Sequence, residues 1–255
     1  METKTQKPQL IIVPEEDYAY GLLHGSYPEY KAELSSGKLM VLSPEDAQLC
    51  FGVPEPEENH IYVRNIFDGT YRDIASASIE NDFIKAKAVA LREALVMLGV
   101  YSANVTRNIH HTKESDIKAN LNGKRAGLSG DIEYHQNKKQ EIDIDAVIGL
   151  DPFPRKAENV EEIRKYINCH GLGNESSLVA WIDRLERGGK LEGGETIEFT
   201  FLDELQVARD AALNLKMVQA EVGFNIKSIN KEKHEFTEKI SVNWSAPSVI
   251  NGHED

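Results

Sequence analysis

The stretch ETIEFTFLDELQVARDAALNLK (residues 195–216) holds a strand pattern and a helix pattern next to each other. Its first part alternates apolar and polar residues, which predicts a half-buried strand over 195–201. Its second part repeats apolar residues every three or four positions, which predicts an amphipathic helix over 202–216. The apolar residues are Ile197, Phe199 and Phe201 in the first part and Leu205, Ala208, Ala212 and Leu215 in the second.

Two further alternating segments follow this helix. Apolar residues alternate from Val218 to Ile226 and again from Phe236 to Trp244, with a polar turn around SINKEKH between them. The pattern predicts an antiparallel hairpin, in which 236–244 returns along 218–226. The helix 202–216 is then expected to cover the apolar face of that hairpin.

The same order of patterns occurs earlier in the chain. A strand is predicted over 61–67, and the clearest helix of the chain over 81–99. A short strand (100–105) and two alternating segments (128–134 and 141–148) follow that helix. The helix carries an apolar stripe, which consists of Ile84, Ala88, Leu91, Leu95 and Leu98. It ends at Gly99, which takes the C′ position. The sequence therefore predicts two pattern-related helix-plus-hairpin units.

These patterns divide the chain into five segments and indicate an α+β fold, with antiparallel sheets covered on one face by helices. The segments are an acidic helical or loop region (1–60), the first unit (61–150), a helical connector (151–194), the second unit (195–244) and a flexible tail (245–255). Within them, helices are also predicted over 14–25, 43–52, 158–168 and 176–187.

Composition limits the classes of function. The formal net charge of the 255-residue chain is −13, which disfavours binding to nucleic acid. Residues 1–60 alone hold 11 acidic and 4 basic side chains. Two cysteines, Cys50 and Cys169, form no disulfide framework. We find neither a secretory leader nor an apolar run of membrane-spanning length, so we expect a cytoplasmic protein.

The segment DIEYHQNKKQEIDID (131–145) is the main candidate for a site. Both strand registers that keep its apolar residues on one face place carboxylates opposite each other. A divalent cation would relieve this repulsion, so a metal site is one hypothesis. A contact with a basic surface and a plain solvated face are the alternatives. The proposed metal ligands are Asp131, Glu133, Asp143 and Asp145.

Other motifs carry weaker signals for chemistry. Lys138 and Lys139 would be the basic helpers of a nuclease, but they lie at the turn, away from the acids. Cys169 and His170 are sequence neighbours, which seldom form a nucleophile–base pair. The adjacent His110 and His111 are poorly spaced to chelate one metal ion. No catalytic residue is therefore assigned, and no cofactor is expected apart from the possible divalent cation.

The first hypothesis for function is a non-enzymatic cytoplasmic protein that acts by self-association, as a homo-oligomer, or by binding another protein. Sheets of few strands leave edges that a second chain can pair with. One alternative is a metal-dependent hydrolase or nuclease that uses the acidic hairpin at 131–145. Another is a membrane-active, pore-forming effector that inserts the hairpins 128–148 and 218–244 into a bilayer.

Overall fold

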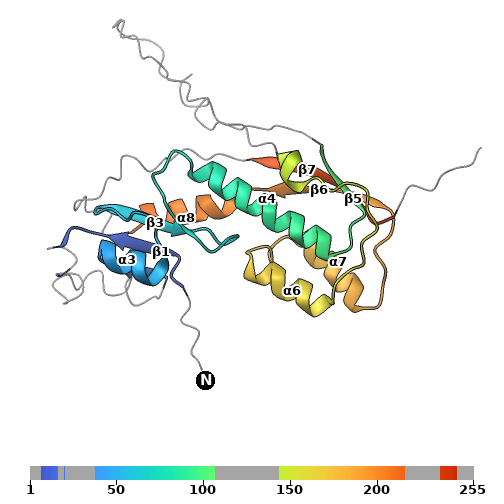
Figure 1. Cartoon of the computed structure of the whole chain (residues 1–255), viewed down its shortest axis with the longest axis horizontal. Coiled ribbons are helices and arrows are strands. Elements are labelled where there is room, and N and C mark those ends of the chain that lie inside the picture. The colour runs from blue at the N-terminus through green and yellow to red at the C-terminus, as the bar shows by residue number, and fades with distance from the viewer. Residues whose placement is uncertain (1–6, 17–19, 21–37, 107–143, 216–235, 246–255) are drawn as a thin grey trace, which may run out of the picture.

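The computed structural model describes residues 7–16, 20, 38–106, 144–215 and 236–245. In these residues helices pack against two sheets, which confirms the α+β class. The helix α4 (Ile79–Met97) runs lengthwise through the molecule, with the first sheet near its start and the second near its end (Figure 1). The predicted strands 128–134 and 218–226 lie outside the described residues, as does all of the predicted tail except Ser245.

The predicted stripe of α4 is confirmed. Its apolar residues Ile84, Ala88, Leu91 and Leu95 are all buried, and they belong to one core that also takes in residues of both sheets. Gly99 ends the helix with a φ of +76°. A Cβ there would lie 2.7 Å from the Ala157 nitrogen, so a larger residue is excluded by space as well as by conformation.

The first sheet has the order β2-β1-β3-β4. Its strands are β1 (Leu10–Val13), β2 (Leu39–Val41), β3 (His60–Arg64) and β4 (Tyr71–Asp73). The β1–β2 pair is parallel and the other pairs are antiparallel. The helix α3 (Pro44–Phe51) covers one face through a small cluster that includes Ile11, Val13, Ala47, Tyr62 and Tyr71. The opposite face joins the main core.

The prediction for residues 1–60 missed two of these strands. The helix predicted over 43–52 is confirmed as α3, but β1 and β2 were expected to be loop. All four residues of β1 are buried, because one sheet face is under α3 and the other faces the main core. A strand buried on both faces shows no alternation, and its apolar run is too short to be told from a loop.

The second sheet has the order β5-β7-β6, with both pairs antiparallel. Its strands are β5 (Ser102–Thr106), β6 (Gly194–Thr200) and β7 (Thr237–Asn243). The predicted strand 236–244 is thus confirmed as β7. From Lys239 to Asn243, β7 pairs with β5 along one edge and with β6 along the other, so the predicted pairing with 218–226 is wrong there. Strands from the two predicted units therefore share this sheet, whereas β3 lies in the other one.

A second correction concerns the segment 141–148, which was predicted as a strand of the acidic hairpin. Residues Ile144–Ile148 form the short helix α5. Its two isoleucines are four positions apart and both are buried, so they share one side of a helical turn. The same residues also fit the period of a strand, so the apolar pattern alone does not separate the two structures.

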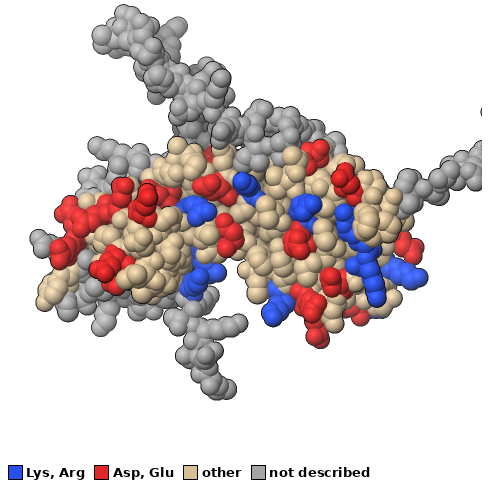
Figure 2. Space-filling model, in the orientation of Figure 1, with Lys and Arg blue, Asp and Glu red and all other residues tan. Residues whose placement is uncertain are grey.

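The remaining helices were predicted closely. They are α6 (Val160–Cys169), α7 (Ser176–Glu186) and α8 (Asp203–Leu213). None of the helices in the described residues is long and apolar enough to cross a bilayer. Acidic side chains gather over the end of the molecule that carries α3 (Figure 2), in agreement with the excess of acids counted in residues 1–60.

The hydroxyl of Tyr71 provides a test of how the chain before β1 is held. It donates a buried hydrogen bond of 2.7 Å to the carbonyl oxygen of Pro8. Replacing Tyr71 with phenylalanine leaves that oxygen unsatisfied, so we expect the free energy of unfolding at neutral pH to fall by about 1–3 kcal/mol.

The same residue predicts a pH dependence. Burial raises the pKa of Tyr71 from 10.0 to about 12, with Arg64 opposing the shift. The folded state therefore favours the neutral phenol. The resulting stabilisation of the folded state is fully present below pH 10.0 and is lost as the pH rises toward about 12. Urea unfolding across this range should show a smaller loss of stability in Tyr71→Phe than in the wild type. An equal loss in both proteins would contradict this assignment.

Candidate functional site

The predicted metal ligands are only partly within the described residues. Asp131, Glu133 and Asp143 lie outside them. Asp145 lies in α5, where its Oδ1 accepts a hydrogen bond of 2.9 Å from the backbone nitrogen of Val105 in β5. Within the described part of the chain, no group of three or more His, Cys, Asp or Glu side chains is arranged to hold a metal ion. The metal site at 131–145 stays a prediction.

The Cys169–His170 pair lies at the end of α6. Cys169 is exposed, while the His170 ring stacks on Tyr166 with ring centroids 4.1 Å apart. The Nδ1 atom of His170 also lies 3.0 Å from the Tyr166 carbonyl oxygen. These contacts give the histidine a packing role at the helix end. The predicted pair His110 and His111 lies outside the described residues.

A pocket of about 560 Å³ lies where α4, the start of α7, the end of β6 and the start of α8 meet. Its ionisable lining consists of four carboxylates and two cations, namely Glu175, Glu198, Asp203, Glu204, Arg64 and Lys87. The acids therefore outnumber the bases. Because these residues come from elements far apart in sequence, only the fold brings them together.

Lys87 is the centre of this pocket's charge network. It lies on the buried side of α4, and its side chain is only 2% exposed. Its Nζ donates to the Thr200 carbonyl oxygen at 2.6 Å and pairs with Glu175 at 2.6 Å and Glu204 at 3.2 Å. It also lies 5.3 Å from the centre of the Phe67 ring. All three ammonium donors have acceptors, so Lys87 joins α4 to β6, α7 and α8.

Glu204 lies farther from the Lys87 nitrogen than Glu175 does, at 3.2 Å against 2.6 Å. Burial raises the pKa of Glu204, and the nearby Lys87 only partly offsets that shift. The Oε2 atom of Glu204 is buried and has no hydrogen-bond partner in the part of the chain that the structure describes. A second ion pair, Arg209 with Glu80 at 2.9 Å, joins α8 to α4 on the same side. The arginine of this pair is 5% exposed. The Lys87–Glu204 and Arg209–Glu80 pairs therefore both lie in a poorly solvated contact between α4 and α8.

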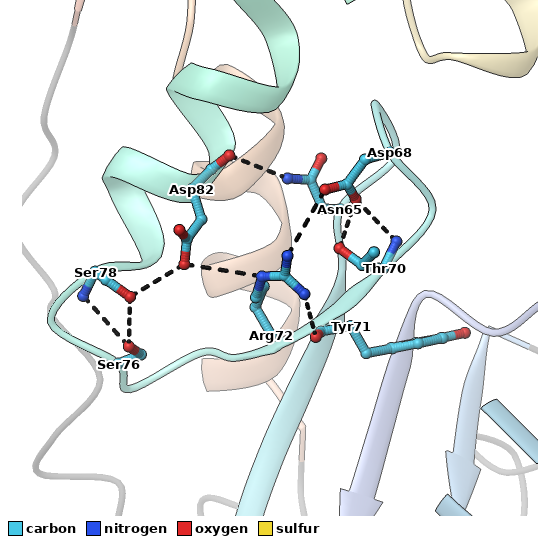
Figure 3. Close-up of polar contacts among 8 residues, drawn as sticks. All are labelled: Asn65, Asp68, Thr70, Tyr71, Arg72, Ser76, Ser78 and Asp82. Carbon is cyan, nitrogen blue, oxygen red and sulfur yellow. Dashed lines mark hydrogen bonds and ion pairs between the residues drawn. The ribbon is translucent and has the colours of Figure 1, made fainter. Parts of the chain in front are cut away.

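A smaller pocket of about 460 Å³ lies beside the turn that joins β3 to β4. Figure 3 shows Arg72 between Asp68 and Asp82, and it lies 3.8 Å from a carboxylate oxygen of each. Arg72 also donates to the Tyr71 carbonyl oxygen, and the Ser78 hydroxyl donates to Asp82. Arg72, Asp68 and Asp82 are already paired with one another, so this cluster is best explained as a support for the turn and for the start of α4.

The two edges of the second sheet differ. The outer edge of β5 is covered, because Ala103 exchanges backbone hydrogen bonds with Leu150 and the Val105 nitrogen donates to Asp145. In β6 the odd-numbered residues face β7, as the bond from the Phe201 nitrogen to the Phe236 carbonyl oxygen shows. The even-numbered residues of β6 therefore point their backbone groups to the outer side.

On that outer side, the Thr200 carbonyl oxygen accepts from Lys87. The outward groups of Thr196 and Glu198 have no backbone partner among the described residues. Both side chains belong to exposed residues. Within the described part of the chain, the second sheet thus has one covered edge and one open edge, and the pocket lies at the end of the open edge. We refer to the outward backbone groups of Thr196 and Glu198 as the open β6 edge.

The sequence patterns did not single out Lys87, Glu175 or Glu204. A signal was present for the lysine, because Lys87 is three positions after Ile84 and four before Leu91, within the apolar stripe of its helix. A charge at such a position predicts a buried partner, but it does not say which one. Comparison of the chain with protein-family models, curated proteins and solved structures found no match.

Proposed function

We propose that this protein acts in the cytoplasm as a non-enzymatic binding protein, and that its open β6 edge pairs with an extended segment of another protein. The observation that carries the proposal is the difference between the two edges of the second sheet. Backbone and side-chain groups cover β5, whereas the outward backbone groups of Thr196 and Glu198 have no partner among the residues that the structure describes. An added strand would satisfy those groups with main-chain hydrogen bonds.

Charge favours a different protein over a second copy of this chain as the occupant. The chain carries a formal net charge of −13, and the acids Glu198 and Asp203 are exposed beside the open edge. Two copies would bring like charges together, which slows and weakens association. The hydrolase and membrane hypotheses rest mainly on residues outside the described ranges and stay predictions.

A proline at position 196 tests the proposal. The Thr196 nitrogen points away from β7, so proline removes an outward donor without breaking the pairing within the sheet. Short peptides selected by display against the wild-type protein should bind Thr196→Pro about tenfold more weakly, since one strand hydrogen bond is lost and the edge is obstructed. Fluorescence anisotropy with labelled peptides measures this change.

The matched control is Thr196→Val, which keeps the backbone donor and should bind the same peptides as the wild type does. Urea unfolding of both variants checks that the sheet is intact. Equal binding to Thr196→Pro and wild type would contradict the proposal. A concentration-dependent dimer in light scattering that Thr196→Pro abolishes would instead identify a second copy as the occupant.

A further inference from the structure

The geometry points to the kind of partner: an extended segment that pairs with the open β6 edge and places a lysine or arginine side chain in the pocket lined by Glu175, Glu198, Asp203 and Glu204. This inference rests on the proposed function. The inference adds to the proposed function the chemistry by which the partner is recognised.

The first step is the position of the pocket relative to the edge. Glu198 and Thr200 belong to β6 and also line the pocket. The Thr200 carbonyl oxygen, which points to the outer side, is bonded to Lys87 inside the pocket. The pocket therefore lies on the open side of β6, just beyond Glu198. A strand paired with Thr196 and Glu198 runs to its mouth, and its next side chain has the pocket in front of it.

The second step is charge. The lining holds four carboxylates and two cations, and Lys239 outside it lies 3.8 Å from Glu198, so one negative charge remains in excess. The ammonium of Lys87 already uses its three donors on Thr200, Glu175 and Glu204. Lys87 has no donor left for an acidic guest. A basic side chain offsets the excess negative charge, whereas an acidic one adds to it.

The third step is the shape of the basic side chains. Ile66, Phe83 and Val207 add apolar wall to the same pocket, and Val207 is 61% exposed. Lysine and arginine carry an aliphatic stem below a charged head. The stem covers the apolar wall while the head stays among the carboxylates. A short polar or a purely apolar side chain satisfies only one of these two surfaces.

The experiment uses the tightest peptide from the display selection, with its basic residue replaced by norleucine, which keeps an aliphatic stem and lacks the charge. We expect lysine and arginine to be enriched among the selected peptides at one position. The norleucine peptide should bind the wild-type protein about tenfold more weakly than its parent. Its binding should also depend less on salt concentration, because salt screens the charged contact.

The protein variant that tests the pocket is Glu198→Gln combined with Asp203→Asn, since both residues are exposed at its rim. This double variant should bind the basic and the norleucine peptide with affinities within about threefold of each other. The matched control is Glu192→Gln, which removes an exposed acid that is not part of the lining. It should keep most of the preference for the basic peptide. Urea unfolding confirms that each variant is folded.

The outcomes separate this inference from the proposed function. If Thr196→Pro weakens binding but the selected peptides show no preference for a basic residue, the edge is a docking site and the inference is overturned. The inference is also overturned if Glu192→Gln removes the preference as fully as the rim variant does. Butylammonium serves as the free-amine probe. If butylammonium binds the wild-type protein and Thr196→Pro equally, and at the concentration at which the peptide binds, the pocket recognises a free amine. The inference that an extended segment supplies the basic group is then overturned.

Discussion

Replacing Lys87 with alanine is expected to lower the free energy of unfolding by about 3–5 kcal/mol, because it leaves two carboxylates without their shared cation. Glu175 and Glu204 lie 2.6 Å and 3.2 Å from the Lys87 nitrogen. Their side chains are 18% and 21% exposed, so water replaces the lost partner only in part. The Thr200 carbonyl oxygen loses its donor as well. Urea unfolding at neutral pH measures the change.

Lys85 is the matched control, because it lies on the same helix and is exposed. Lys85→Ala should change stability by no more than about 0.5 kcal/mol. The pH dependence gives a second check. Lys87 lowers the pKa of Glu204 against the effect of burial, so removing Lys87 raises that pKa further in the folded state and the variant's deficit is greatest at neutral pH. The deficit should shrink as the pH falls toward the unfolded value of 4.5.

A rescue variant distinguishes uncompensated charge from lost packing. Lys87→Met combined with Glu175→Gln and Glu204→Gln removes all three charges and keeps side chains of similar length. We expect it to recover most of the stability that Lys87→Ala loses, since neutral replacements of a buried ion cluster often fold as well as the original. If the triple variant is as unstable as Lys87→Ala, the loss comes from packing around α4, and the charge explanation is wrong.

The contrast between α4 and α5 shows which parts of this fold were predictable from sequence. The stripe of α4 spans four turns with a consistent helical period, so no strand fits it. In α5 the buried positions are Ile144 and Ile148, and their spacing is an even number that also fits a strand. The stretch is little more than one turn long, so its packing against α4 and β5 decides its structure. These contacts are not visible in the local pattern.

Strand neighbours were harder to predict than the strands themselves. The alternation in β7 gives its buried face, with Ile240 and Val242 inside. Alternation carries no information on which strands lie to either side, and β7 pairs with β5 and β6, which are distant in sequence. The open edge and the Lys87 pocket both depend on this pairing. The site therefore became visible only in the fold, even though each strand of the second sheet had been expected.

Replacing Trp181 with alanine is expected to lower the free energy of unfolding by about 3–5 kcal/mol, the second large effect. Trp181 is 2% exposed and lies in α7 against the second sheet. It meets Trp244 edge to face, with ring centroids 4.8 Å apart, and its Nε1 donates to Glu195 at 2.9 Å. Alanine leaves a cavity in the core and removes both contacts, which together join α7 to β6 and to the end of β7.

The two tryptophans of the pair should respond differently to phenylalanine. The Nε1 of Trp181 has an acceptor, so Trp181→Phe should cost about 1–3 kcal/mol. The Nε1 of Trp244 is buried and has no hydrogen-bond partner among the described residues, so Trp244→Phe removes an unsatisfied donor and should change stability by less than about 1 kcal/mol. Urea unfolding of both variants tests the difference. Equal losses would show that ring volume, rather than the hydrogen bond to Glu195, decides the contribution of each residue.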